Sequence, residues 1–286
     1  MTNFSYDEAF SRNIGWITQE EQQKLRNCRI AIAGMGGVGG AHLLTLSRLG
    51  IGHFNISDLD EFEVANFNRQ AGASMKTLGR EKVEVLEEMA KNLNPEQEIK
   101  SFPHGVTEEN VDEFLDGVDL YVDGLDYFAV SARRATFAKC HEKGIPAVTA
   151  APLGIGAAVL NFIPGGMSFE DYFRLEGKSE MEQLLSFLIG LSPAMLQRTY
   201  LADPTTVDLA NHKGPSTPMA VEICAGMAAS QAMKILLNRG PVMSAPWGQQ
   251  FDGYRDKYKK TWRPGGNNNP IQKLTLLIAK KQLGIS

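Results

Sequence analysis

The amino-acid sequence predicts an α/β fold: a doubly wound, mainly parallel sheet with helices on both faces and a partly antiparallel C-terminal extension. Short apolar runs alternate with helical patterns from residue 29 to residue 150, and this alternation is typical of parallel sheets. The first apolar run is followed directly by the glycine-rich segment Gly34-Met35-Gly36-Gly37-Val38-Gly39-Gly40 and a helical pattern. Strand, glycine turn and helix in this order indicate a Rossmann-like nucleotide-binding unit.

The elements follow one another along the chain with recognisable signals. The segment Thr18-Gln19-Glu20-Glu21 has the form of a capping box and predicts a short helix that ends at Asn27. Strands are predicted at residues 29–33, 53–57, 98–102, 119–123, 147–150 and 157–162. Helices are predicted after the glycine loop and at residues 81–93, 108–115, 129–143, 184–191, 217–237 and 271–283. Because strict alternation ends near residue 154, the strand at 157–162 is expected to begin the antiparallel section.

The 286 residues are predicted to form a single domain with four segments. These are an N-terminal helical arm (1–28), a nucleotide-binding core (29–163), a substrate-side insertion (164–216), and a long helix with a C-terminal tail (217–286). The insertion mixes short helices with Pro and Gly turns, which is typical of a substrate-covering segment. Its aromatic stretch at 165–173 either faces substrate or anchors the core. The last helix is expected to dock on its own domain, with binding of a partner as the alternative.

Composition and charge narrow the class of protein. Hydrophobic residues make up 43% and charged residues 22% of the chain, which is close to the average of globular proteins. The net charge of -4 gives no overall attraction to nucleic acid or to an anionic membrane, and no basic run is evident. The first fifteen residues lack an apolar run, so we expect no secretory signal and a cytoplasmic location. The apolar stretches 184–191 and 217–237 are interpreted as buried helices, not as membrane spans.

The glycine loop predicts a phosphate site. Gly34 permits the tight turn, Gly36 lets the backbone approach a phosphate, and Gly39 lets the helix close on the strand. The N-terminus of the helix then faces the anion with free N–H groups. Asp58 ends the second predicted strand, where a carboxylate can accept the ribose hydroxyls. The alternative is a glycine turn that serves only close packing.

Two cations and a carboxylate distinguish between nucleotides. Arg69 and Lys82 follow the second strand closely in sequence, and the extra charge of a triphosphate favours such cations more than a dinucleotide does. Asp123 and Asp126 lie at the end of the fourth predicted strand, at the same edge of the sheet as the glycine loop. A carboxylate facing a triphosphate is a plausible Mg²⁺ ligand. The set therefore predicts nucleotidyl transfer from ATP.

These motifs resemble the ThiF, MoeB and HesA adenylyltransferases, relatives of the ubiquitin-activating enzymes, over nearly the whole chain. The matching segments are S-R-N-I at 11–14, the GMGGVGG loop, D-L-D with N-F-N-R-Q at 58–70, G-R-E-K at 79–82, and D-G-L-D at 123–126 followed by Arg133. The resemblance implies that Asp58 binds the ribose, that Asn66, Arg69 and Lys82 bind phosphates, and that Asp126 holds Mg²⁺. It also implies that Arg12 reaches in from a partner subunit, and hence a homodimer.

Further residues complete the expected nucleotide site, each with an open alternative. Gly37, Asp60 and Gln70 are expected to line it. Asp60 could instead cap the following turn, and Gln70, like Asn68, could simply satisfy backbone groups of its loop. For Arg12, Arg69 and Lys82 the alternative is that each is a solvated charge on the protein surface.

The chain departs from the family pattern in three ways. It has no C-x-x-C pair, so no structural zinc site and no disulfide framework are expected. Tyr127 follows Asp126 where many members have Asn, and Tyr127 could stack on the adenine or merely cover it. Residues 164–216 contain no cysteine, and Cys28, Cys140 and Cys224 are interpreted as core residues. We therefore expect adenylation without an enzyme-bound thioester.

The leading functional hypothesis is ATP- and Mg²⁺-dependent adenylation of a carboxylate, with the C-terminal glycine of a ubiquitin-like or sulfur-carrier protein as the substrate. A tRNA threonylcarbamoyladenosine dehydratase is a close alternative, against which the net charge and the lack of a basic run count. An NAD-dependent oxidoreductase would use the same glycine loop but leaves the cations and Asp126 unexplained. A non-catalytic nucleotide-binding module is the third alternative.

Overall fold

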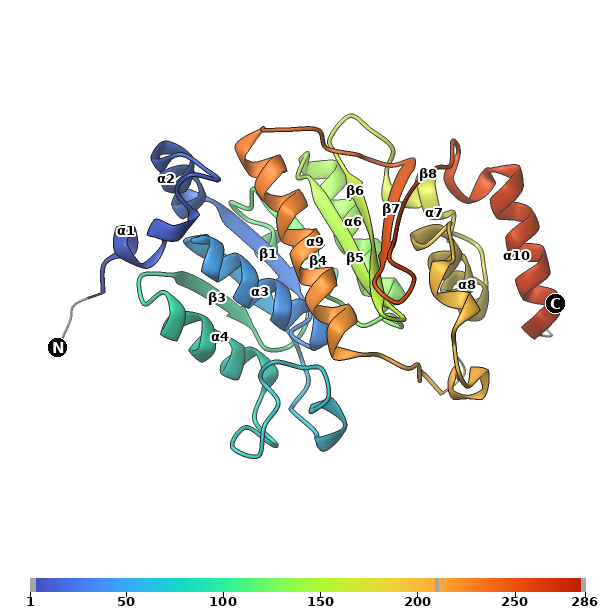
Figure 1. The fold of residues 1–286 in the computed structure, drawn as a ribbon, viewed down its shortest axis with the longest axis horizontal. Helices are drawn as coiled ribbons and strands as arrows, with labels where there is room; N and C mark the ends of the chain where they lie inside the picture. The colour runs from blue at the N-terminus through green and yellow to red at the C-terminus, as the bar shows by residue number, and fades with distance from the viewer. Residues whose placement is uncertain (1–3, 209–210, 284–286) are drawn as a thin grey trace.

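The computed structural model describes residues 4–208 and 211–283, and all structural statements below refer to these residues. Residues 1–3 of the expected arm, 209–210 of the expected insertion and 284–286 of the expected tail lie outside them. One eight-stranded sheet has the strand order β3-β2-β1-β4-β5-β6-β7-β8 (Figure 1). The strands are β1 (Arg29–Ala33), β2 (His53–Ser57), β3 (Glu98–Phe102), β4 (Leu120–Asp123), β5 (Ala147–Leu153), β6 (Gly156–Phe162), β7 (Trp247–Asp252) and β8 (Lys257–Trp262).

The sheet changes character at β5. Strands β3, β2, β1, β4 and β5 pair in parallel, whereas β5–β6, β6–β7 and β7–β8 pair antiparallel. The register of β1 places Ile32 beside Ile56 of β2 and Val122 of β4. This arrangement confirms the predicted fold class, including the antiparallel C-terminal section.

Helices cover both faces of the sheet (Figure 1). The α-helices are α1 (Tyr6–Ala9), α2 (Gln19–Asn27), α3 (Gly37–Leu49), α4 (Lys82–Leu93), α5 (Val111–Phe114), α6 (Val130–Lys143), α7 (Phe169–Phe173), α8 (Glu180–Leu191), α9 (Pro218–Leu237) and α10 (Pro270–Leu283). Short 3-10 helices are η1 (Ser11–Asn13), η2 (Val64–Asn66), η3 (Leu196–Thr199), η4 (Pro204–Thr206) and η5 (Gly266–Asn268).

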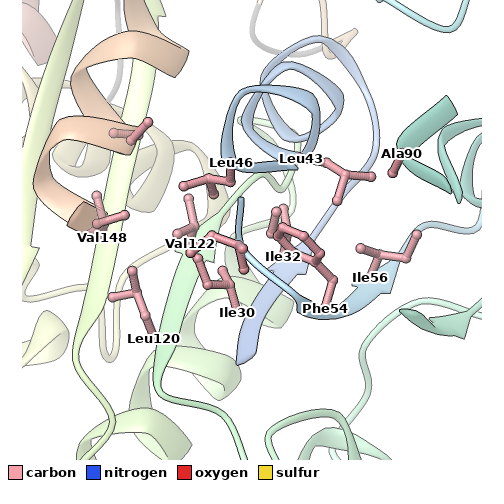
Figure 2. Packing of buried hydrophobic residues seen from close by; sticks show 14 of the residues in the cluster. Ile30, Ile32, Leu43, Leu46, Phe54, Ile56, Ala90, Leu120, Val122 and Val148 are labelled. Atoms are coloured by element: carbon pink, nitrogen blue, oxygen red, sulfur yellow. The ribbon is translucent and has the colours of Figure 1, made fainter. Parts of the chain in front are cut away.

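Successive side chains of a strand point to opposite faces of the sheet and so belong to two separate hydrophobic cores. Ile30 and Ile32 of β1 belong to the core that contains residues of α3, α4 and α9, as Figure 2 shows for the part under α3. Ala31 and Ala33 of the same strand belong to the core on the other side, with residues of α6, α7 and α8. A strand buried on both faces is expected in a doubly wound sheet, because helices cover each side.

Helix α9 has the apolar composition that the sequence showed. Within the described residues it is the one helix long and apolar enough to cross a membrane by length and composition, and half of its most apolar window is buried. It packs against α3, β5 and β6. This packing accounts for its apolar surface and agrees with the interpretation as a buried helix.

The hairpin formed by β7 and β8 is a correction to the sequence analysis, which expected neither strand. Strand β7 buries Gln249 and Gln250, so its sequence lacks the apolar alternation by which strands are recognised. The expectation that no basic run is present was also wrong. Residues 255–263 contain five cations and one acid: Arg255, Lys257, Lys259, Lys260, Arg263 and Asp256.

The N-terminal arm packs on the far end of α3. The Tyr6 hydroxyl donates to the carbonyl of Gly50 at 2.5 Å, and Asn13 Nδ2 donates to the carbonyl of Leu49 at 3.2 Å. Gln22 of α2 also donates to the Leu49 carbonyl, at 3.0 Å. The arm therefore satisfies carbonyl groups at the C-terminus of α3, which a helix leaves without internal partners.

Candidate active site

The glycine loop connects β1 to α3 by very close backbone approaches. A Cβ atom added at Gly34 would lie 2.2 Å from the carbonyl oxygen of Gly124, and one added at Gly39 would lie 1.7 Å from the carbonyl oxygen of Gly34. Gly34 also has a φ of +89°, which favours glycine. Packing within the protein therefore explains these two glycines, because no side chain fits at either position.

Packing does not explain Gly36 and Gly37. A Cβ atom at Gly36 would lie no closer than 3.7 Å to the side chain of Gln70, and one at Gly37 no closer than 3.5 Å to Arg69 and Val221. Both distances are ordinary van der Waals contacts. Gly36 is the N-cap of α3, and no side chain caps the helix there. The first turn thus presents free N–H groups beside two positions that a side chain could fill, which suits close approach of an anion.

Asp58 holds the loop in place. Its carboxylate accepts hydrogen bonds from the backbone N–H of Met35 at 2.5 Å and of Asp60 at 2.8 Å. Burial raises the pKa of Asp58 above its usual value, although these two donors oppose the shift. Each carboxylate oxygen has a further lone pair. The predicted contact with a ribose hydroxyl is therefore geometrically open to a residue that already fixes the turn.

Lys82 is buried, with a side chain 8% exposed, and its Nζ lies 2.9 Å from Oδ2 of Asp60. The backbone joins the same pair, since the Lys82 N–H donates to the Asp60 carbonyl at 2.9 Å. Lys82 is therefore not a solvated surface charge. The expected turn-capping alternative for Asp60 does not hold for its side chain, which pairs with Lys82.

Arg69 and Gln70 lie against the glycine loop. The Cγ atom of Arg69 is 3.5 Å from the Cβ position of Gly37, and its guanidinium donates to the carbonyl of Ala65 and to the Asn68 side chain. Gln70 is buried, and its Oε1 atom has no hydrogen-bond donor within the described residues. The structure thus brings a cation and an unpaired amide oxygen to the start of α3.

Asn66 and Asn68 serve the loop that carries these residues. The buried Asn66 accepts a hydrogen bond from the backbone N–H of Glu63 at 3.0 Å. Asn68 Nδ2 donates to the carbonyl of Ser216 at 3.0 Å, which ties the loop to the segment before α9. The structure therefore gives both residues loop-ordering contacts, and it leaves the predicted phosphate contact of Asn66 untested.

The two carboxylates at the end of β4 and in the turn that follows have different environments. Asp123 is buried, and its Oδ2 accepts from Arg133 Nε at 2.7 Å and from the Thr149 hydroxyl at 2.8 Å. Asp126 is exposed, and among the residues that the structure describes its carboxylate accepts one hydrogen bond, from the backbone N–H of Phe128 at 3.0 Å. Of the pair, Asp126 has the exposed carboxylate, whereas Asp123 is buried in an ion pair with Arg133.

Arg133 is a positioning residue whose contacts the sequence did not predict. The buried guanidinium donates to the carbonyls of Leu125 at 2.7 Å and Asp126 at 3.0 Å, besides its ion pair with Asp123. These bonds fix the turn that presents Asp126. A charged residue seven positions after Asp126 is the available signal, since one helical turn into α6 brings Arg133 back to the turn that follows β4.

Tyr127 is held by contacts within the protein, which count against the predicted stacking on adenine. Its hydroxyl donates to the carbonyl of Leu184 in α8 at 2.6 Å, and its ring packs against Phe187. The next residue, Phe128, stacks on His212 with ring centroids 4.6 Å apart. The expected insertion therefore lies beside the turn that carries Asp126. Within that insertion, the buried Phe169, Tyr172 and Phe173 anchor the core.

Arg12 lies far from the glycine loop of its own chain. Its 3-10 helix packs at the C-terminus of α3 through Asn13, whereas the loop precedes the N-terminus. The 13 residues of α3 separate the two ends by about 20 Å. Arg12 is exposed, and no hydrogen bond or ion pair is recorded for its side chain within the described residues.

Metal-binding and thiol groups complete the inventory. Within residues 4–208 and 211–283, no group of three or more His, Cys, Asp or Glu residues could hold a metal ion. Mg²⁺ commonly uses one or two carboxylates together with phosphate oxygens, so Asp126 fits a metal that arrives with a nucleotide. All three cysteines are buried, and burial raises the pKa of the Cys28 thiol to about 11. The thiol pKa values of Cys140 and Cys224 are raised further by burial.

A glycine loop, an uncapped helix N-terminus, flanking cations and an exposed carboxylate together form a candidate nucleotide-binding site at one edge of the sheet. The chain belongs to the ThiF family, whose model matches residues 10–270. This confirms the resemblance seen in the sequence.

The relatives that match the chain carry several different names. A tRNA threonylcarbamoyladenosine dehydratase of Bacillus subtilis (strain 168) is 32% identical over 141 residues, 49% of this chain and 55% of that protein. A sulfur carrier protein ThiS adenylyltransferase of Escherichia coli (strain K12) is 27% identical over 148 residues, 52% of this chain and 58% of that protein. The chain thus spans about half the length of the curated relatives it matches.

Solved structures share the fold. Escherichia coli MccB with succinimide superposes with a TM-score of 0.68 at 18% identity, covering 91% of this chain and 72% of that one. Escherichia coli tRNA N6-threonylcarbamoyladenosine dehydratase, TcdA, superposes with a TM-score of 0.61 at 22% identity, covering 81% and 95%. Both likenesses support the assigned architecture.

Proposed function

We propose that this chain is an adenylyltransferase that binds ATP and Mg²⁺ at the glycine-loop edge and transfers AMP to a carboxylate. The observation that carries the proposal is the position of Arg69 and Gln70 against the uncapped N-terminus of α3. A redox dinucleotide needs only the helix end for its pyrophosphate, whereas a triphosphate benefits from cations beside it. Relatives named as adenylyltransferases support this choice.

The chemistry follows from the charges. A carboxylate oxygen of the substrate forms a bond to the α-phosphorus of ATP, and the bond to the leaving pyrophosphate breaks, so negative charge builds on the phosphoryl oxygens. Arg69 and the N–H groups of α3 stabilise that charge. Lys82 does so by sharing its ammonium between Asp60 and a phosphate. Asp126 would hold Mg²⁺, which supplies further positive charge to the phosphates when bound.

The proposed carboxylate is the C-terminal glycine of a ubiquitin-like or sulfur-carrier protein. Relatives from Thermus thermophilus and Escherichia coli are named as sulfur carrier protein adenylyltransferases. We further propose that the acyl adenylate passes on without an enzyme thioester, because all three thiols are buried with raised pKa values. Alkylation of the native protein is expected to leave pyrophosphate exchange unchanged, and loss of exchange would contradict this.

A second candidate is activation of a threonylcarbamoyl carboxylate on tRNA. The basic hairpin 255–263 favours it, since this exposed run supplies the positive surface that the overall charge of the chain lacks. Three relatives named tRNA threonylcarbamoyladenosine dehydratase support it further. ATP–pyrophosphate exchange stimulated by a carrier protein ending in glycine, compared with exchange stimulated by modified tRNA, separates the two substrates.

The nucleotide assignment is tested by Arg69→Ala with Arg48→Ala as the matched control. Arg48 lies at the other end of α3, is exposed, and has no recorded side-chain partner within the described residues. Loss of one contact to transition-state charge typically costs about 10²- to 10³-fold in rate, so exchange should fall by that factor in Arg69→Ala only. ATP with Mg²⁺ at 100 times its Kd should stabilise the wild type by about 2.7 kcal/mol. Stabilisation by NAD instead would overturn the proposal in favour of an oxidoreductase.

We also propose that Arg12 acts in the site of a second chain in a homodimer. Support comes from the separation of about 20 Å between Arg12 and its own glycine loop. Mixing Arg12→Ala and Asp126→Ala chains produces heterodimers. In each heterodimer, the site on the Arg12→Ala chain keeps its own Asp126 and receives an intact Arg12 from the Asp126→Ala chain. Exchange should therefore reappear on mixing two inactive variants. Additive, uncomplemented activity would contradict the role in trans.

A further inference from the structure

The β7–β8 hairpin carries a basic and aromatic surface that the nucleotide site does not use. We call it the hairpin stripe, and it consists of Trp247, Arg255, Lys257, Tyr258, Lys259, Lys260 and Trp262. Strand β8 is exposed at every position but Thr261, and it pairs only with β7. In a chain of net charge -4, this stripe concentrates positive charge on one edge.

The aromatic residues of the stripe share one face. Pairing places Trp247 opposite Trp262, and Gln249 opposite Lys260, so Tyr258, Lys260 and Trp262 project to the same side as Trp247. Trp262 is 55% exposed, Tyr258 49% and Trp247 40%. The ammonium of Lys260 lies 6.0 Å from the centroid of the Tyr258 ring. On this face Lys260 therefore lies between the rings of Tyr258 and Trp262, whereas Lys257 and Lys259 project to the opposite face of the strand.

Two neighbouring groups add to this face. Burial lowers the pKa of Lys234 in α9, and the positive charge of the nearby Lys260 lowers this pKa further. Gln249 is buried, and its Oε1 atom accepts a hydrogen bond from the Tyr258 hydroxyl at 2.8 Å. The Gln249 Nε2 donor has no acceptor within the part of the chain that the structure describes.

Solubility alone does not explain the stripe. Lysines on an edge strand prevent sheets from joining edge to edge, and this accounts for Lys257 and Lys259. It does not account for three large exposed aromatic rings on the face that carries Lys260, because exposed aromatic surface works against solubility. Rings interleaved with cations are instead suited to stacking of unpaired bases while the cations contact the phosphates.

The stripe begins at the catalytic edge. Two antiparallel steps separate β7 from β5, so β7 runs in the same direction as β4 and β5 (Figure 1). The turn between β7 and β8, with Arg255, therefore lies at the edge where β4 ends and Asp126 follows. From that edge the six residues of β8 extend for about 20 Å. A strand bound along β8 would have one end directed to the glycine-loop edge.

We propose that the hairpin stripe binds a single-stranded segment of RNA, with bases on Tyr258 and Trp262 and phosphates on the lysines of β8. The proposal deepens the tRNA candidate above and rests on it only for the identity of the RNA, because the stripe lies outside the nucleotide site. An acidic protein surface would use the cations but not the rings.

Fluorescence anisotropy with a labelled RNA stem-loop, in the absence of ATP, tests the proposal. The wild type should bind the stem-loop more tightly than a duplex of equal length, with an affinity that falls as salt rises. Lys259→Glu/Lys260→Glu should weaken binding by tenfold or more. Trp262→Ala should weaken it by about 5- to 100-fold, the range that stacking of one base supports. Lys100→Glu, an exposed lysine on the opposite edge strand β3, should not change binding.

Three outcomes would overturn the proposal. One is equal loss of binding in Lys100→Glu, which would mark a general charge effect. Another is unchanged binding in Trp262→Ala, which would leave attraction between charges alone. The third is displacement of RNA by polyglutamate at equal charge concentration, which would mark an acidic protein as the partner. Thermal stabilisation by ATP and Mg²⁺ is measured on the same variants, so that a failure of the nucleotide site is seen separately.

Discussion

The glycine-loop edge and the β7–β8 hairpin are built on opposite principles. At the glycine loop, backbone approaches backbone so closely that Gly34 and Gly39 admit no side chain. On the hairpin, the side chains of β8 other than Thr261 are exposed, and packing restricts them little. A change in the first region is therefore expected to alter folding and chemistry together, whereas a change in the second is expected to alter binding alone. The following predictions test and refine this contrast.

The largest expected effect is on Asp126. Asp126→Ala removes the proposed Mg²⁺ ligand, and ATP–pyrophosphate exchange should fall at least as far as the 10²- to 10³-fold typical of one lost transition-state contact, to near-complete loss. The one hydrogen bond that its carboxylate accepts within the described residues, from the Phe128 N–H, makes little contribution to folding, so the thermal midpoint should stay near that of the wild type. Asp116→Ala, another exposed acid, is the control. Exchange that survives in Asp126→Ala would remove this residue from the site.

Next in size is the buried pair beneath that turn. Arg133→Met leaves Asp123 charged, buried and without its ion-pair partner, a change that typically costs about 3–5 kcal/mol of unfolding free energy. Urea denaturation measures this loss. The double variant Asp123→Leu/Arg133→Met should recover much of the stability, because no unpaired charge remains. Equal instability of the double variant would show that the pair does not act as a unit.

Two glycine substitutions are expected to separate an effect on folding stability from an effect on ATP binding. Gly39→Ala places a methyl group 1.7 Å from the carbonyl oxygen of Gly34, so overpacking should cost about 1–3 kcal/mol or more of stability. Gly36→Ala fits within the protein at 3.7 Å and should fold nearly as well as the wild type, yet bind ATP more weakly by calorimetry. A Gly36→Ala variant with unchanged ATP affinity would mean that no phosphate approaches this position.

The smallest effect concerns pH and the docking of α10. Hydrogen bonding to Lys280, followed by bonds to Ser179, lowers the pKa of Glu182 to about 2. The folded-state pKa lies below the unfolded value near 4.5, so this contribution to stability is present above pH 4.5 and is lost as the pH falls toward 2. Glu182→Gln should flatten the acid dependence of the urea midpoint. An identical acid dependence in both proteins would contradict this coupling.

The sequence predicted the centre of the sheet better than its edge. Strand, glycine loop and helix are local patterns, and Asp58, Arg69 and Lys82 follow them at short separation, so their approach to the loop could be anticipated. Strand β7 could not be recognised, because Gln249 and Gln250 are polar residues that become buried. Gln250 donates a hydrogen bond to the Gln197 side chain, and Gln249 accepts one from the Tyr258 hydroxyl. The different burial of Asp123 and Asp126 depends on Arg133 and Thr149, which reach the turn only in the folded chain.

The arm that carries Arg12 is fastened to the end of α3 that lies farthest from the glycine loop. A helix of this length keeps the two apart in every copy of the chain, whatever small motions occur. If Arg12 serves catalysis, turnover per molecule must rise with protein concentration and level off once association is complete. Dilution would then act as an inhibitor, without any ligand being removed.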